Sequence, residues 1–205
     1  MNETQQFICE QCGSSFDISL PEIIDAQKNP SEADDVKTGS IFLKSCPECG
    51  HKNLILWEFF YKDTEKGYAL HLCKKNGTHK PGLKDSFLRQ RIVYEPVEMI
   101  EKIFIFDQGL DDRVIEIMKL MNLLVVSEDK DIEISDIIFS PDEEGNNHFL
   151  ILSEGEEYGT TTFSQDMYED VKETFITNLS PEYAVSERVD DTWALHAVRK
   201  DQMLS

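Results

Sequence analysis

The sequence predicts an α+β protein built in two parts, residues 1–125 and residues 126–205. Three observations lead to this fold class. Two short cysteine motifs lie in the first part, apolar residues change between alternating and helical spacing along the chain, and acidic residues gather after residue 126. A chain of 205 residues is long enough to bury a core in each part.

The two cysteine motifs share one pattern, in which a pair of cysteines is followed directly by glycine: Cys9-Glu10-Gln11-Cys12-Gly13 and Cys46-Pro47-Glu48-Cys49-Gly50. Two residues between the cysteines let both sulfurs turn toward one point about 2.3 Å away, the length of a zinc–thiolate bond. The glycine permits the backbone turn that such a loop needs. We therefore predict that Cys9, Cys12, Cys46 and Cys49 bind one structural Zn²⁺ per chain, because four thiolates leave no coordination position for water.

Other uses of paired cysteines are a disulfide, a redox motif or ordinary burial in a core. A redox Cys-x-x-Cys belongs at the N-terminus of a helix, whereas the residues after both motifs have the pattern of strands. Disulfides need an oxidising compartment, and nothing in the sequence indicates export. His51 is an alternative fourth ligand, and Cys73 is predicted to be a small core or surface residue outside the metal site.

The N-terminal part is predicted to be a zinc-ribbon-like domain with a small antiparallel sheet. Strands are expected at 7–8, 14–20 and 40–45, with a capping box that opens a short helix over 19–28 and a second short helix after Ser31 that ends at Gly39. Residues 54–61 and 68–72 predict a β-hairpin, because they are rich in aromatic, leucine and isoleucine side chains around a polar turn. This hairpin is expected to share a sheet with the cysteine motifs, and residues 74–84 are expected to form a loop.

A helical hairpin is predicted to follow. Pro96 suits the first position of a helix, and Asp111 suits the N-cap of a second helix. Apolar residues of this second helix recur at helical spacing, and Ile115 and Leu123 widen the stripe formed by Val114, Ile117, Met118, Met121 and Leu124. We expect the two helices to cover the sheet that carries the cysteines.

Residues 126–205 predict a separate acidic α+β module of order β-β-β-α-β. Strands are expected at 132–140, 147–153 and 158–163, a helix at 165–178 and a closing strand at 192–198 that buries His196. This part holds 5 basic and 20 acidic residues, a net charge of −15. Such a charge favours a basic protein partner and disfavours nucleic acid, whose phosphates are also negative.

The N-terminal part resembles the CpXC family, which is named for cysteine–proline–any–cysteine motifs. The resemblance spans about residues 5–125 and is carried by Cys46-Pro47-Glu48-Cys49-Gly50, Tyr61-Lys62-Asp63, Glu101-Lys102-Ile103 and Gly109-Leu110-Asp111-Asp112-Arg113. The first motif departs from the family, since Glu10 stands where proline is common. The resemblance implies a bacterial or archaeal protein with this fold and these cysteines, and it implies no reaction.

No known catalytic motif is present: the sequence has no phosphate loop, dinucleotide fingerprint, HExxH helix or nucleophile elbow. We therefore expect a non-enzymatic, zinc-binding interaction or regulatory protein. One alternative is an acidic inhibitor or immunity-type protein that binds a basic partner through residues 126–205. Another is an enzyme whose cleft lies between the two parts.

The N-terminus lacks the basic start and apolar core of a signal peptide. No apolar run approaches the roughly 20 residues of a membrane span. We therefore expect a cytoplasmic protein without membrane contact, in a compartment that keeps thiols reduced.

Overall fold

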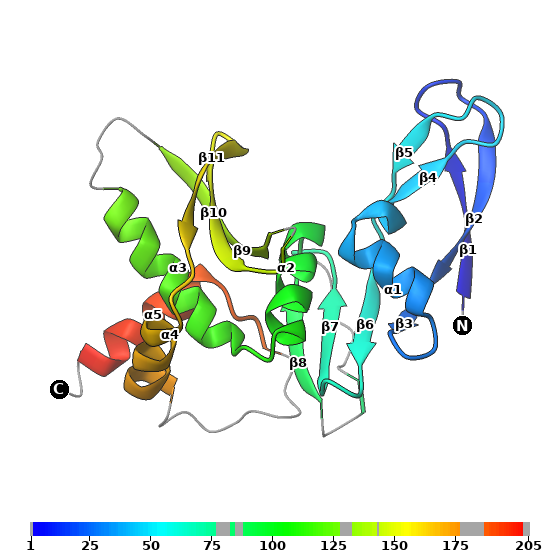
Figure 1. Cartoon of the computed structure of the whole chain (residues 1–205). Coiled ribbons are helices and arrows are strands. Elements are labelled where there is room, and N and C mark those ends of the chain that lie inside the picture. Colours follow the sequence, from blue (N-terminus) through cyan, green and yellow to red (C-terminus); the bar gives the residue numbers. More distant parts are fainter. Residues whose placement is uncertain are drawn as a thin grey trace. The chain divides into compact units, whose positions relative to one another are not determined.

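The computed structural model describes residues 2–76, 83–84, 88–127, 133–142, 144–176 and 187–202, and it confirms the predicted α+β class. The chain forms two compact units. The first comprises Met1–Ile100 with Tyr183–Glu187, and the second comprises Glu101–Glu182 with Arg188–Ser205 (Figure 1). The division between the units falls inside a helix, between Ile100 and Glu101, and the boundary expected between residues 125 and 126 stays a prediction.

The first unit carries the cysteine motifs on two separate two-stranded ribbons. Strand β1 (Asn2–Ile8) pairs antiparallel with β2 (Ser15–Pro21), and β4 (Leu43–Ser45) pairs antiparallel with β5 (Lys52–Leu54). The β2 strand buries Ile18 and Leu20 on one face, as its alternating sequence predicted. Each ribbon turns at one cysteine motif, so the two motifs are presented by two hairpin ends.

A four-stranded sheet forms the core of the first unit. Its strand order is β3-β6-β7-β8, with β3 parallel to β6 and β7 parallel to β8. The strands are β3 (Ile23–Asp25), β6 (Phe59–Asp63), β7 (Tyr68–Leu72) and β8 (Arg89–Val93). The β6–β7 hairpin is confirmed, but it lies in this sheet and not in a sheet with the cysteine ribbons, and β8 was not predicted.

The predicted helix over residues 19–28 is wrong. Residues up to Pro21 continue β2, and β3 follows at once, with the Phe60 amide donating to the Glu22 carbonyl at 2.9 Å. Ile24 lies opposite Tyr61 and is fully buried. Pairing with a strand 37 residues later therefore overrides the local capping-box signal.

The short helix after Ser31 is confirmed as α1 (Pro30–Lys37). Gly39 follows its C-cap with φ +73°, a left-handed conformation that favours glycine. The predicted strand over 40–45 begins instead as a 3₁₀ turn at Ser40–Phe42 and becomes β4 only afterwards. Phe42 packs with Trp57 at 5.7 Å between ring centroids, so this turn supplies core to the first unit.

Two predicted helices are confirmed as α2 (Pro96–Asp107) and α3 (Asp112–Val126). The Asp111 side chain accepts a hydrogen bond from the Arg113 amide and so caps α3, as predicted. The apolar stripe is only half right, because Met121 is 38% exposed and Leu124 65% exposed. Helix α3 belongs to the second unit and the cysteine-bearing strands belong to the first, so the expected cover of those strands by the helices stays a prediction.

The second unit pairs a three-stranded antiparallel sheet with helices. The predicted strands are confirmed as β9 (Ile134–Pro141), β10 (Asn147–Ser153) and β11 (Glu156–Thr162), in the order β11-β10-β9. The predicted helix is α4 (Gln165–Val171), capped by Ser164 and continued by a π-helical turn at Lys172–Ile176. Helix α3 contacts β9, α4 and the last helix, which places α3 in the core of this unit.

The predicted closing strand over 192–198 is wrong, since these residues belong to helix α5 (Asp191–Gln202). The Asp190 carboxylate accepts from the Trp193 amide at 2.9 Å, a hydrogen bond that caps the first turn. Ala194 is buried and His196 is exposed, so His196 is not a core residue. The order of the second unit is therefore β-β-β-α-α from β9 onward.

Candidate metal centre

The two cysteine motifs fold into the same loop. In each, the amide of the glycine donates to the carbonyl of the first cysteine at 2.9 Å, namely Gly13 to Cys9 and Gly50 to Cys46. The amide of each first cysteine donates to the carbonyl of the residue after the glycine, namely Cys9 to Ser14 and Cys46 to His51. Both glycines have φ near +73°, a conformation that other residues adopt at a cost. The glycines therefore serve the turn for which they were predicted.

The four predicted ligands come together. All four sulfurs lie within 4.8 Å of one another, with Cys9 Sγ 3.7 Å from Cys49 Sγ and Cys12 Sγ 3.8 Å from Cys46 Sγ. A regular tetrahedron with bonds of about 2.3 Å has edges of about 3.8 Å, so these separations suit one zinc-sized ion. A disulfide would need about 2.05 Å, and all four cysteines are free thiols. The cluster can therefore hold a metal ion.

Asn53 joins the two ribbons beneath the cysteines. Its side-chain oxygen accepts from the Glu10 amide of the first motif at 3.1 Å, and its side-chain amide donates to the carbonyls of Lys44 and His51 in the second ribbon. The side chain is buried. Sequence reasoning missed this residue, because its role appears only when the two hairpins meet.

Ser14 is the other residue of the site that the sequence did not single out. Its hydroxyl oxygen lies 2.8 Å from Cys12 Sγ and 3.4 Å from Cys46 Sγ, so one hydroxyl contacts a sulfur from each motif. The contact of the Ser14 hydroxyl with Cys46 is the main cause that lowers the pKa of Cys46 to about 6, and its contact with Cys12 lowers the pKa of Cys12.

Cys49 behaves in the opposite way. The His51 amide lowers the pKa of Cys49, but the Cys12 thiol, desolvation and the other sulfurs outweigh it and raise this pKa to about 12. Four neighbouring thiols therefore do not all ionise readily by themselves. A bound divalent cation would compensate the accumulated negative charge, and protons would leave as the metal binds.

The remaining candidates lie away from the sulfurs or have other roles. The His51 carbonyl accepts from the Cys46 amide. Cys73 is buried directly after β7, and its amide donates to the Val93 carbonyl. His71 stacks on Phe60 at 4.1 Å between ring centroids. His79 lies outside the described residues.

A scan of family models matches the description "CpXC protein" to residues 7–119. The chain belongs to the CpXC family. The match covers more than half of this CpXC protein, including both cysteine motifs, and it agrees with the resemblance over about residues 5–125. Neither the curated proteins nor the solved structures contain a match to the chain.

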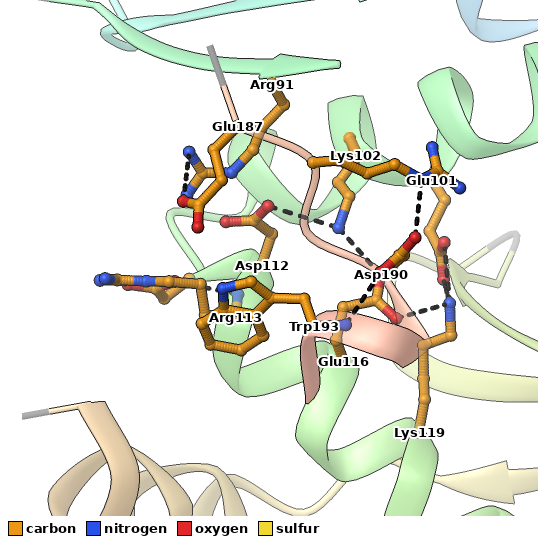
Figure 2. Close-up of polar contacts among 12 residues, drawn as sticks. Arg91, Glu101, Lys102, Asp112, Arg113, Glu116, Lys119, Glu187, Asp190 and Trp193 are labelled. Carbon is orange, nitrogen blue, oxygen red and sulfur yellow. Dashed lines mark hydrogen bonds and ion pairs between the residues drawn. The ribbon is translucent and has the colours of Figure 1, made fainter. Parts of the chain in front are cut away.

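A second polar cluster of this CpXC protein lies in the second unit (Figure 2). Lys102 Nζ contacts Asp112 at 3.3 Å and Glu116 at 2.9 Å, and Lys119 Nζ contacts Glu116 at 3.3 Å and Glu101 at 3.0 Å. These five side chains form one continuous chain of alternating charge. Its end is fixed to β9, since Glu101 also accepts from a backbone amide of that strand, at Phe139, at 2.7 Å.

Most side chains of this charge chain are buried, which makes the ion pairs important for stability. The Lys102, Asp112 and Glu116 side chains are at most 4% exposed. Burial alone would lower the pKa of Lys102, but the carboxylates of Glu116 and Asp112 outweigh it and raise that pKa. The ions are paired with one another and with the backbone, which is the arrangement that buried charges require. The chain fastens α2, α3 and β9 together and is assigned no ligand.

Sequence reasoning noted Glu101, Lys102 and Asp112 only as part of the family resemblance. A signal for their role was present, because Glu101 and Lys102 interrupt an otherwise apolar helical run, 99–106. Charged residues at core positions are seldom fully buried unless they are paired.

Among the described residues, no helix is long and apolar enough to cross a membrane.

Proposed function

We propose that this CpXC protein binds one Zn²⁺ through Cys9, Cys12, Cys46 and Cys49 and that the ion is structural. The observation that supports this proposal is the set of four sulfurs that all lie within 4.8 Å of one another, with two pairs at 3.7 Å and 3.8 Å. Thiolate is a favoured ligand of zinc, and four of them complete its coordination without an open position for substrate. The ion would hold together the two ribbons that carry the cysteine motifs.

Metal analysis of the untagged protein tests the proposal. We expect about one zinc ion per chain and its loss in Cys46→Ala. The matched control is Cys73→Ala, which removes a buried thiol of the same unit outside the cluster. Folded wild-type protein that takes up no zinc would refute the proposal, as would a Cys46→Ala variant that keeps its zinc.

We further propose a non-enzymatic, cytoplasmic role as an interaction or regulatory module. A closed metal site builds a fold and offers no Lewis acid to a substrate. The cytoplasm suits the proposal because reduced thiols are needed to bind the ion.

A basic protein is the partner class that we propose as a second, compatible function. The exposed acids at the two turns of the β9–β10–β11 sheet favour it: Asp142, Glu144, Glu154, Glu156 and Glu157. Association steered by such charge weakens as salt rises.

Affinity capture from the native cell at low and at high salt tests this second proposal. We expect a basic protein at low salt, lost when Glu154, Glu156 and Glu157 are changed to Gln. Three acids of the first unit changed in the same way, Asp17, Glu32 and Asp34, serve as the control. Capture of no basic protein, or equal capture by both triple variants, would count against the proposal.

A further inference from the structure

We infer that Cys49 is the sulfur of the metal-loaded centre that a soft electrophile modifies first, and that the Ser14 hydroxyl sets this order. The inference rests on the proposed zinc site and deepens it, because it identifies where the site can be opened chemically. Neither the family match nor the cysteine motifs imply any difference among the four sulfurs.

Burial divides the four cysteines into two pairs. The first cysteine of each motif, Cys9 or Cys46, is buried, and the second cysteine of each motif, Cys12 or Cys49, is exposed. A reagent in solution therefore reaches only Cys12 and Cys49 directly. These two residues hold equivalent positions in the two loops, so they form a natural comparison.

The backbone amides near Cys12 and Cys49 act on the two sulfurs in the same way. The backbone amide two residues later, that of Ser14 or of His51, acts to lower the pKa of each thiol. The two sulfurs differ in the hydroxyl, since the Ser14 oxygen lies 2.8 Å from Cys12 Sγ, whereas no hydroxyl of the described residues bonds to Cys49. Among the hydrogen bonds of the described residues, the Ser14 hydroxyl therefore distinguishes Cys12 from Cys49.

A hydrogen bond to a thiolate withdraws electron density from the sulfur and lowers its nucleophilicity. Hydrogen bonds to charged acceptors are the stronger class, and the thiolate is the reactive form of cysteine. In the loaded site all four sulfurs are thiolates bound to one ion, so the hydroxyl is what separates Cys12 from Cys49. The exposed sulfur without it keeps more of its charge and reacts first.

The reaction with iodoacetamide is a simple displacement. The Cys49 sulfur attacks the methylene carbon, the new S–C bond forms as the C–I bond breaks, and iodide leaves with the electron pair. The thiolate becomes a neutral thioether. The ion then loses one anionic ligand, which weakens its hold on the two ribbons.

Competitive alkylation of the zinc-loaded full chain tests the inference. The protein is treated with substoichiometric iodoacetamide, a neutral reagent that the acidic neighbours do not repel, and initial rates at each cysteine are measured by peptide mass spectrometry. We expect Cys49 to react about tenfold faster than Cys12, a difference of ~1.4 kcal/mol. In Ser14→Ala the two rates should approach each other, because Cys12 becomes more reactive.

Two controls keep the result interpretable. Ser15→Ala removes a neighbouring exposed hydroxyl that has no contact with the sulfurs among the hydrogen bonds of the described residues, and it should leave the order unchanged. Ser14→Thr keeps a hydroxyl and should keep Cys49 first, which covers the case in which Ser14→Ala fails to fold.

Zinc content measured on the same samples separates the possible failures. Wild-type protein with one zinc per chain and equal rates at Cys12 and Cys49 overturns this inference while the proposed function stands. An unchanged rate ratio in folded, zinc-loaded Ser14→Ala also overturns it. Protein that holds no zinc overturns both proposals.

Discussion

At the scale of single residues, the cysteines could be found from sequence and their supports could not. The spacing of Cys9, Cys12, Cys46 and Cys49 is a local property, and the structure brings their sulfurs within 4.8 Å. Asn53 and Ser14 act on a hairpin other than their own. A sequence pattern carries no trace of such a contact, because it depends on how two ribbons that are distant in the chain approach each other.

Replacing Asn53 by Ala should destabilise the first unit by about 1–3 kcal/mol, because it leaves the Glu10 amide and two carbonyls without this partner. Thermal unfolding followed by Trp57 fluorescence measures the loss, since Trp57 is buried in the first unit and stacks on Phe59 at 5.0 Å. Lys52→Ala changes the exposed neighbour on the same strand and should have little effect. Equal unfolding temperatures for the two variants would contradict the role assigned to Asn53.

At the scale of elements, local patterns predicted most helices and strands and failed where a distant partner decides. Strand β3 follows a capping-box sequence, yet its backbone pairs with β6. The run 192–198 predicted a strand, whereas these residues belong to helix α5, whose first turn is capped by the Asp190 carboxylate. The apolar stripe of α3 predicted burial along its whole length, whereas only its first half meets the core.

The buried charge chain predicts a large effect of one substitution. Lys102→Met should destabilise the second unit by about 3–5 kcal/mol, because the buried Asp112 and Glu116 carboxylates would both lose the cation between them and Glu116 would keep only Lys119. Urea unfolding followed by Trp193 fluorescence in a Trp57→Phe background measures it, since the chain has two tryptophans, one in each unit. Lys172→Met removes an exposed ion pair and should cost under about 1 kcal/mol. A loss of similar size in both variants would show that the buried chain contributes no special stability.

The same chain predicts how stability depends on pH in the alkaline range. Burial lowers the pKa of Lys119, but the charges of Glu101 and Glu116 outweigh it and raise this pKa above its ordinary value of 10.5. Above that value the unfolded lysine loses its proton while the folded one keeps it. Stability is therefore fully present below pH 10.5 and falls as pH rises, by up to about 1.4 kcal/mol per pH unit for this group.

Lys119→Arg is the matched variant for that measurement, because arginine stays charged in both states. Urea unfolding of the second unit between pH 9 and pH 12 should show a smaller loss of stability in the variant than in the wild type. Parallel losses in the two proteins would mean that Lys119 does not contribute to the alkaline dependence.

At the scale of the whole molecule, the four cysteines and both ribbons belong to the first unit, and the second unit has a core of its own. That second core includes Phe139 and Phe149, which are fully buried and meet edge to face at 5.9 Å between ring centroids. The charge boundary in the sequence signalled a second module, but it could not reveal that α3 packs there with β9. The charge pattern indicates which residues lie at the surface, whereas the division into units depends on which residues pack in each core.

Removing the metal should therefore release the two ribbons of the first unit while the second unit stays folded. Structural zinc sites contribute apparent binding free energies on the order of 10–16 kcal/mol, so a strong chelator should release the ribbons of the first unit. Hydrogen exchange with mass spectrometry should show lost protection in β1, β2, β4 and β5 and retained protection in β9 and β10, because the latter strands depend on no cysteine. Returning zinc to the sample should restore the protection of the ribbons. Loss of protection in β9 and β10 at the same chelator concentration would mean that the two units fold as one, and unchanged protection in the ribbons would mean that the four sulfurs do not need an ion.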